Sequence, residues 1–341
     1  EVALAERLPT GAPPAAVRVD AARVAARARE RTRPELAALA RDPDASSAAE
    51  VERVVDHVAL AARLEPDRPV ERATLDTLIV AISSLLRRVP ARVARVVADL
   101  APDDLKLQAA VARFARTENT SSKRLLLPVA RRAYELAERP EDRRELGLVL
   151  CVVLDGLETR KKHPAEVEAL ATELLADPAL EPVARGTLHE LRHEAWRELG
   201  LLEGALEDID ASLRCVPERE TLLVDRAQVR ALLGDQVGAL DEALDYVRRT
   251  EWAADAKVSV GALDEATRLV WDLGRAQGRL TDVRAVLDRY LIARAERWGW
   301  SLRAAHLAAT AGDAHAAVTH VERAVAALEA EGDQDERATF L

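Results

Sequence analysis

Four glycines recur at a nearly fixed spacing in the C-terminal half of the 341-residue chain. They are Gly200, Gly234, Gly278 and Gly312, and the intervals between them are 34, 44 and 34 residues. Each glycine separates two segments whose apolar residues recur with helical periodicity. A spacing of 34 residues is typical of a solenoid built from helix–turn–helix units. An extra short segment at about residues 251–262 accounts for the longer middle interval.

The positions that follow each glycine predict how the two helices of a pair pack. The glycine is expected to end the first helix in a left-handed conformation, which it adopts without a Cβ penalty. After it we expect an apolar residue that tucks into the pair, a small residue at the helix crossing, and a buried apolar stripe. The tucked residues are Leu202, Val237, Leu280 and Ala314, the crossing residues are Ala205, Ala239, Val283 and Ala317, and the stripe is Ile209/Leu213, Ala243/Val247, Leu287/Leu291 and Val321/Val325.

This pattern, with Pro217 at the end of the first copy, resembles the tetratricopeptide repeat (TPR) family over residues 187–328. The resemblance implies an all-α fold, a right-handed α-α superhelix in which antiparallel helix pairs stack as a solenoid. It also implies that the concave face binds another protein or a peptide. Trp271 and Arg226 replace or flank small residues on the first helices, so the register there departs from the family pattern.

Composition favours the all-α class independently. Apolar residues make up 49% of the chain but aromatic residues only 3%, so Ala, Leu and Val must form the core, which suits helix-on-helix packing. We expect a disordered leader at residues 1–14 and a TPR-like solenoid at 141–341. Residues 15–140 between them are expected to be either degenerate repeats or a separate helical domain. Helix breaks are expected near Pro34, residues 42–44, Pro66, Pro90, Pro102, Asn119, Pro140, Pro164, Pro178 and Pro182.

Charge and cysteine content restrict the partners and the compartment. The formal net charge of −10 disfavours a nucleic-acid partner, because neutralisation of phosphates drives that kind of binding. No apolar run approaches the roughly 20 residues that span a bilayer, so no membrane partner is expected. Cys151 and Cys215, each within an apolar helical pattern, are interpreted as buried reduced thiols, which favours the cytoplasm. No phosphate-binding loop or dinucleotide-binding motif is present, and no cofactor is expected.

Residues 189–193 read HELRH, which matches the HExxH pattern of zinc metallopeptidases. Resemblance to that family would imply His189 and His193 as zinc ligands and Glu190 as the general base. However, Arg192 occupies an interior position where those enzymes usually carry an uncharged residue, and no third ligand stands out downstream. We therefore favour an ordinary helix surface and keep a metal site as the alternative.

Residues 87–132 are locally basic. They hold eleven Lys or Arg residues against four Asp or Glu residues. The segment could dock an acidic partner or nucleic acid. The favoured interpretation is a solvated helix face whose Arg side chains cover an Ala-rich surface.

Together these features predict a protein- or peptide-binding scaffold and not an enzyme. Candidate groove residues on the first helices are Arg192, Trp196, Arg226, Arg230 and Trp271. Two alternatives remain open from the sequence. One is a zinc-dependent metallopeptidase that uses HELRH, and the other is a sensor solenoid that responds to a peptide.

Overall fold

The structure is a computed structural model that describes residues 15–42, 47–84, 89–157, 163–250, 260–293 and 298–331. Within these ranges the chain is all-α and forms no strand, as predicted. The expected leader at residues 1–14 lies outside the described residues. The helices are α2 (Ala15–Arg41), α3 (Ala48–Leu64), α4 (Arg72–Ser84), α5 (Ala91–Leu100), α6 (Leu105–Arg116), α7 (Thr120–Leu136), α8 (Pro140–Asp155), α9 (Pro164–Leu175), α10 (Pro182–Glu198), α11 (Leu202–Cys215), α12 (Thr221–Leu232), α13 (Gln236–Arg249), α14 (Val260–Ala276), α15 (Leu280–Ala293), α16 (Trp298–Thr310) and α17 (Ala314–Glu331).

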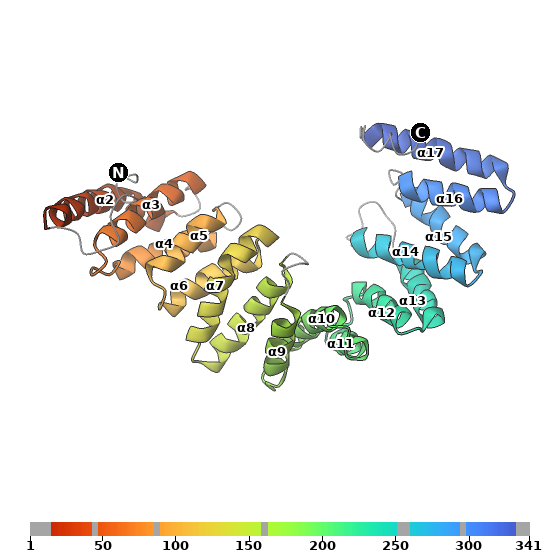
Figure 1. Cartoon of the computed structure of the whole chain (residues 1–341), viewed down its shortest axis with the longest axis horizontal. Coiled ribbons are helices and arrows are strands. Elements are labelled where there is room, and N and C mark those ends of the chain that lie inside the picture. Colours follow the sequence, from red (N-terminus) through yellow and green to blue (C-terminus); the bar gives the residue numbers. More distant parts are fainter. Residues whose placement is uncertain are drawn as a thin grey trace. The chain divides into compact units, whose positions relative to one another are not determined.

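The helices form two compact units, residues 1–195 (unit 1) and residues 196–341 (unit 2). Consecutive helices pack side by side, as in α6 with α7 or α12 with α13 (Figure 1). We call α2, α4, α6, α8, α10, α12, α14 and α16 the first helices, and each is followed by a second helix. First helices also contact first helices, and second helices contact second helices, so each unit is a two-layered stack. The chain is therefore a helical-repeat protein.

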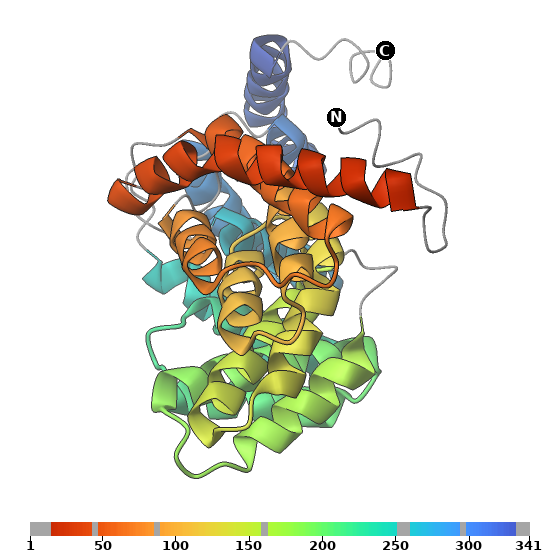
Figure 2. The same ribbon diagram turned by 90° about the vertical axis from the view of Figure 1, so that its left-hand side faces the viewer.

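The predicted helix boundaries at proline and asparagine are nearly all confirmed. α8, α9 and α10 begin with Pro140, Pro164 and Pro182, where the missing amide hydrogen has no helical partner to lose. The break expected at Pro34 is wrong, because α2 runs through it from Ala15 to Arg41 (Figure 2). Packing of this long helix against α3 compensates for the hydrogen bond that the proline removes.

Unit 1 is linked along its stack by ion pairs. Its core consists mainly of Ala, Val and Leu with Phe114 and Cys151. On the surface, Arg113 lies 2.6 Å from Glu145, and Arg144 lies 2.9 Å from Asp177. The partners are 32 and 33 residues apart in sequence. This regular offset indicates a helix-pair repeat in unit 1, where the apolar pattern alone shows no clean period.

The basic segment at residues 87–132 is largely neutralised by such pairs. Arg131 lies 2.6 Å from Glu166, Arg132 lies 2.5 Å from Asp103, and Arg92 pairs with Glu52. Arg87 and Arg88 lie outside the described residues. Two of these acidic partners, Glu52 and Glu166, lie outside the segment, so a count of charges along the segment overstates its positive field.

In unit 2 the glycine pattern is confirmed. Gly200, Gly234, Gly278 and Gly312 have φ angles of 76°, 92°, 69° and 77°, a region that disfavours residues with a Cβ. The crossing residues Ala205, Ala239 and Val283 are fully buried, whereas Ala317 is only partly buried. The tucked positions are wrong at Val237 and Leu280, which are 60% and 46% exposed, and at Ala314, which is also exposed. These residues lie in the first turn of the second helix, beyond the reach of the packed face.

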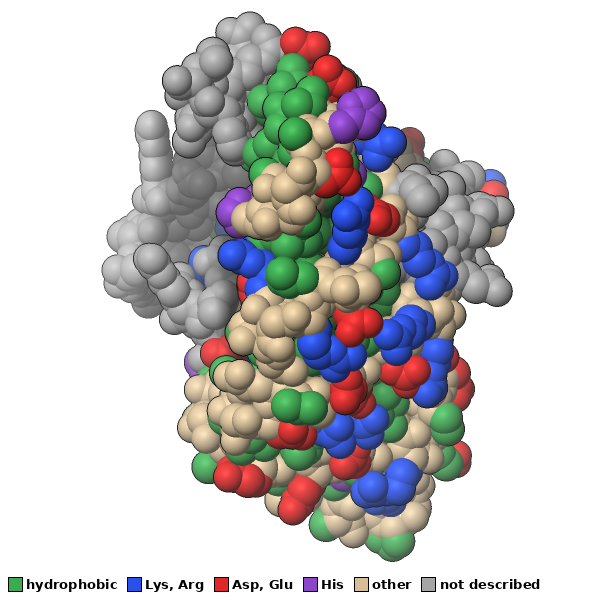
Figure 3. Space-filling view, turned by 90° about the vertical axis from the view of Figure 1, so that its right-hand side faces the viewer, with side chains coloured by type: hydrophobic (Ala, Val, Ile, Leu, Met, Phe, Trp, Pro, Cys, Tyr) green, Lys and Arg blue, Asp and Glu red, His purple; other side chains and the backbone are tan. Residues whose placement is uncertain are grey.

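The apolar stripe on the second helices is confirmed except in α17. Leu287 and Leu291 of α15 are buried in the core that includes α16. The equivalent Val321 and Val325 of α17 are 43% and 50% exposed, because α17 is the last helix of the described residues and nothing in them covers this face. Figure 3 shows hydrophobic side chains gathered at the level of α16 and α17, above a region where basic and acidic side chains alternate.

Both cysteines carry free thiols, but only Cys151 is buried; Cys215 is partly exposed. Burial raises the pKa of the Cys151 thiol to about 12, with smaller contributions from Asp155 and Glu166. None of the described helices is long and apolar enough to cross a membrane.

Candidate functional site

Arg192 and Trp196, both on α10, make contacts within their own units. The Arg192 guanidinium donates a hydrogen bond to the hydroxyl of Thr172 on α9 at 2.9 Å. The Trp196 ring packs on Gly204 of α11, where a Cβ would lie 2.4 Å from the ring. It is only partly buried and borders a small apolar cluster that includes Ile209. Trp196 therefore fills space between helices.

Arg226 and Arg230 of α12 converge on one carboxylate, that of Glu242 on α13. Arg226 Nε donates to Glu242 Oε1 at 2.5 Å, and its Nη1 donates to Asp210 on α11 at 2.7 Å. Arg230 Nη1 lies 3.3 Å from Glu242 Oε2. The Glu242 side chain is only 9% exposed, so this charge is compensated inside the stack. Arg226 thus joins a first helix to two second helices.

Trp271, the last of the five candidates, lies in a cluster of arginines and aromatic rings. It is 7% exposed and belongs to the core of unit 2. The guanidinium carbon of Arg275, one turn further along α14, lies 4.7 Å from the centroid of the Trp271 ring. Arg303 of α16 lies 5.7 Å from the same ring. Both distances are within the range of a cation–π interaction.

A second tryptophan completes the group. The guanidinium carbon of Arg303 lies 4.2 Å from the centroid of the Trp300 ring, one turn earlier on the same helix, α16. Trp300 in turn contacts the buried ring of Tyr290, with centroids 5.5 Å apart. We call Trp271, Arg275, Trp300 and Arg303 the arginine–tryptophan cluster. It spans two successive first helices, α14 and α16.

The two arginines of this cluster differ from Arg226 and Arg230 of α12, which pair with Glu242. Within the described residues, neither Arg275 nor Arg303 forms an ion pair, and their recorded contacts are to tryptophan rings. A guanidinium carries five N–H donors in one plane. When its face rests on a ring, those donors stay available along the edge, and the side chain is already ordered. The cluster can therefore accept a carboxylate or another anion with little further loss of side-chain entropy.

A chain of hydrogen bonds crosses the same layer of first helices in unit 2. Arg197, at the end of α10, donates to Gln228 of α12 at 3.0 Å. Gln228 donates onward to Glu265 of α14 at 2.6 Å, and Arg268 pairs with that glutamate. These groups hold neighbouring first helices in register, so the layer that carries the cluster is fixed by side-chain contacts as well as by its core.

The HELRH residues lie in the middle of α10. His189 is partly exposed, whereas His193 is buried, with its Nε2 atom 3.5 Å from Glu194. Among the residues that the structure describes, His189 and Glu190 belong to no set of three side chains close enough to share a metal ion. The arrangement that the zinc-peptidase pattern implies, with both histidines as ligands, is therefore not formed here.

Sequence reasoning named Trp271 but missed Arg275 and Arg303. A signal was present: both first helices place an arginine one turn after a tryptophan, Arg275 four positions after Trp271 and Arg303 three positions after Trp300. Side chains at these separations lie on the same helix face. What the sequence does not show is that Arg303 also reaches Trp271, because that contact depends on how α14 and α16 pack.

The chain shows only weak similarity to the known proteins named below. No protein-family model and no curated protein matches it. Among solved structures, it is similar to BtubC (BKLC) from P. vanneervenii, with 18% sequence identity and a TM-score of 0.43 over 67% of this chain and 92% of that chain. It is also similar to the human IFIT1 dimer with m7Gppp-AAAA, with 13% identity and a TM-score of 0.35 over 82% of this chain and 68% of that chain. At these values neither likeness bears on what the chain binds.

Proposed function

We propose that this chain is a non-catalytic scaffold of the TPR type that binds an acidic segment of another protein on the first helices of unit 2. The arginine–tryptophan cluster carries the proposal. Its two guanidiniums lie against tryptophan rings and pair with no carboxylate of the described residues. Their edges suit the planar geometry of an Asp, a Glu or a terminal carboxylate. We place the protein in the cytoplasm.

The remainder of the surface makes this cluster selective. The chain carries a net charge of −10, so an acidic segment is repelled at long range by most of the molecule. At physiological ionic strength this repulsion is screened beyond about 8 Å. An acidic segment can therefore bind only where a local cationic group is within contact distance. We expect long-range electrostatic attraction to contribute little to the association rate, and the affinity to depend on the contacts at the cluster.

Aromatic rings add a second kind of recognition. Trp271 and Trp300 lie at the base of the cluster and keep small exposed fractions of 7% and 8%. Leu273 of α14 and Leu307 of α16 lie on the same two helices and pack in the core of unit 2. We expect a bound segment to combine acidic residues with an apolar residue at a spacing that lets both reach the layer of first helices.

The test is selection of random linear peptides on the immobilised full chain. The wild-type chain is expected to select sequences enriched in Asp and Glu, because carboxylates are stronger acceptors for the guanidiniums of Arg275 and Arg303 than neutral groups are. A double variant, Arg275→Ala with Arg303→Ala, is expected to bind the selected peptides at least about tenfold more weakly, the effect of losing one to two charge-assisted hydrogen bonds. Arg284→Ala is the matched control, because Arg284 lies on α15 and is half exposed near two aspartates.

Three outcomes would count against the proposal. The selected peptides could lack acidic residues, or the double variant could bind them as well as the wild type. A short single-stranded RNA could also bind more tightly than any selected peptide and compete with it, which would make nucleic acid the partner. Circular dichroism of the double variant separates a loss of binding from a loss of fold.

A further inference from the structure

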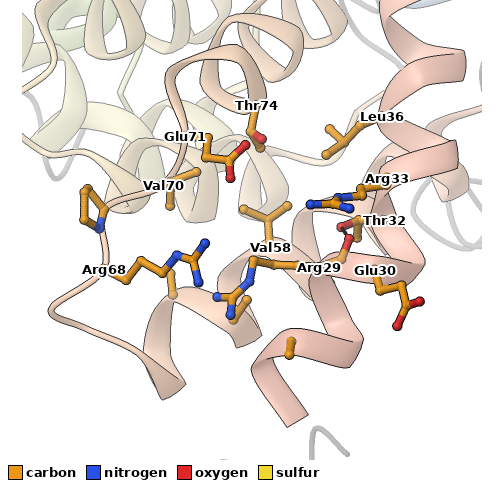
Figure 4. A pocket seen from close by; sticks show the side chains of 14 residues that line it. Arg29, Glu30, Thr32, Arg33, Leu36, Val58, Arg68, Val70, Glu71 and Thr74 are labelled. Atoms are coloured by element: carbon orange, nitrogen blue, oxygen red, sulfur yellow. Dashed lines mark hydrogen bonds between the residues drawn. The ribbon is translucent and has the colours of Figure 1, made fainter. Parts of the chain in front are cut away.

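A pocket of about 340 Å³ lies in unit 1, at the opposite end of the sequence from the cluster. It forms where α2, α3 and the segment leading into α4 meet (Figure 4). Its volume is at the lower end of the range for sites that bind small molecules. The residues around it are Ala26, Arg29, Glu30, Thr32, Arg33, Leu36, Val58, Ala61, Ala62, Arg68, Pro69, Val70, Glu71 and Thr74.

The local sequence explains why a hollow remains here. α3 ends at Leu64 and α4 begins only at Arg72. Pro66 and Pro69 in the connecting segment cannot continue a helix, so the chain turns away before it re-enters the stack. The connection therefore forms one wall of the pocket, and α2 and α3 form the others.

Two of the arginines that line the pocket are held by one carboxylate. Arg29 Nη1 lies 2.7 Å from Glu65 Oε2, and Arg68 Nη1 lies 3.8 Å from the same oxygen. The hydrogen bond from Arg29 lowers the pKa of Glu65, so this glutamate stays ionised at neutral pH. Two guanidiniums present many more N–H donors than one carboxylate can accept. Donors are therefore left over on both side chains.

Arg33 adds a third guanidinium. It follows Arg29 by four residues on α2 and so lies on the same helix face. Within the described residues it forms no ion pair, and in Figure 4 its guanidinium points into the pocket. Of the acids nearby, Glu71 points into the pocket, whereas the Glu30 side chain points away from it (Figure 4).

Apart from the charged residues and the two threonines, Thr32 and Thr74, the lining is apolar. Val58 forms the base between the arginines, and Leu36, Val70 and the alanines of α3 surround it. A ligand that fits this combination has an anionic group at one end and an apolar body at the other. Glu71 opposes a second negative charge, so a single anionic group is favoured.

We propose that this pocket binds a small organic anion, with its carboxylate or phosphate held by Arg29, Arg33 and Arg68 and its apolar body resting on Val58. The site is separate from the cluster in unit 2 and does not depend on the proposed peptide binding. The two sources of the anionic group, a carboxylate and a phosphate ester, are distinguished by the probes below.

The experiment titrates the full chain with benzoate, phenyl phosphate and benzylamine, monitored by ligand-observed saturation-transfer NMR. All three share a phenyl body, so only the charged group differs. Benzoate or phenyl phosphate is expected to bind, and the one that binds more tightly identifies the head group. Benzylamine is not expected to bind. Arg33→Ala should weaken binding by about tenfold, the loss of one charge-assisted contact. Arg27→Ala, an exposed arginine of the same helix that does not line the pocket, should leave binding unchanged.

The variant Glu71→Gln tests the predicted charge preference of the pocket most directly. Removing its charge should tighten anion binding by a few-fold, because the repulsion at that wall is lost. The proposal is overturned if benzylamine binds as well as the anions, if neither anion binds, if Arg33→Ala and Arg27→Ala behave alike, or if Glu71→Gln weakens the binding of the anion. Arg33 and Glu71 are exposed, so both variants are expected to fold.

Discussion

Three arginines of unit 1 and two of unit 2, all on first helices, are used in different ways. In unit 1, Arg72 on α4, Arg113 on α6 and Arg144 on α8 each pair with an acid about one repeat further along. In unit 2, Arg275 on α14 and Arg303 on α16 lie instead against tryptophan rings. The same residue type in the same layer thus links neighbouring repeats at these three positions of unit 1 and remains available to a ligand at these two positions of unit 2.

This difference affects how available the arginines are to a ligand more than it affects the stability of the fold. Exposed ion pairs of the kind seen in unit 1 contribute about 0–1 kcal/mol each. Their larger consequence is that they occupy the N–H donors of the arginines and cancel the local positive charge. A basic stretch of sequence is therefore a poor guide to a binding surface unless the acids that reach it from the next repeat are known.

The largest effect is expected at the repeat interface of unit 2. Leu287→Ala removes a buried side chain between α15 and α16 and should lower the free energy of unfolding by about 3 kcal/mol. Val321→Ala, at the equivalent position of α17, should lower it by less than about 1 kcal/mol, because Val321 is already 43% exposed. Tryptophan fluorescence during urea unfolding measures both, since all five tryptophans lie between residues 196 and 300. Equal losses would mean that α17 is covered in solution.

The second prediction concerns the buried charge that joins the layers of unit 2. Glu242→Gln should destabilise unit 2 by roughly 2 kcal/mol, because it leaves Arg226 with Asp210 alone and removes the carboxylate that Arg230 approaches. Asp241→Asn, one residue earlier, is the control: Asp241 is 60% exposed and its pair with Arg279 is on the surface, so about 0–1 kcal/mol is expected. A similar loss in both variants would show that Glu242 is accessible to water.

The third prediction is a pH dependence confined to unit 1. Burial raises the pKa of Cys151 to about 12 from an ordinary value of 9.0. The folded state therefore favours the neutral thiol, so its contribution to stability is complete below pH 9 and is lost as the pH rises toward 12. At pH 10 about 1.4 kcal/mol should be missing relative to pH 7. Comparison of the wild type with Cys151→Ala, by circular dichroism during urea unfolding, isolates this term; an identical pH slope in the two proteins would contradict it.

The smallest effect separates two kinds of glycine. Gly234→Ala should destabilise unit 2 by about 1 kcal/mol, purely because its φ of 92° disfavours a Cβ, since no atom lies within 4 Å of the place that a Cβ would take. Gly147 in unit 1 has the reverse problem: a Cβ there would lie 2.9 Å from the side chain of Leu174. In a Leu174→Ala background, Gly147→Ala should therefore lower the stability of unit 1 by less than it does alone. Ala substitutions around Gly234 should not reduce the loss of stability caused by Gly234→Ala. Thermal unfolding of the single and double variants tests both statements.

Periodicity predicted much of this fold, and local chemistry predicted the turns. The left-handed glycines, the crossing alanines and the prolines that begin α8, α9 and α10 could all be predicted from sequence, because each depends on backbone conformation at one position. For residues 15–140 the sequence left degenerate repeats and a separate helical domain both open, since the regularity there appears in ion pairs such as Arg113 with Glu145 rather than in apolar spacing. Only part of the arginine–tryptophan cluster could be predicted from the sequence. Trp271 was identified, but the contact from Arg303 depends on tertiary packing.

The central claim is that Arg113 and Arg144 of unit 1 are held by carboxylates, whereas Arg275 and Arg303 of unit 2 remain available to a ligand. The most direct measurement is the rate at which each arginine reacts with phenylglyoxal in the folded chain, read by peptide mass spectrometry. We predict that Arg275 and Arg303 react faster than Arg113 and Arg144, whose donors are held by Glu145 and Asp177. Protection of Arg275 and Arg303 to the same degree as Arg113 and Arg144 would contradict the account.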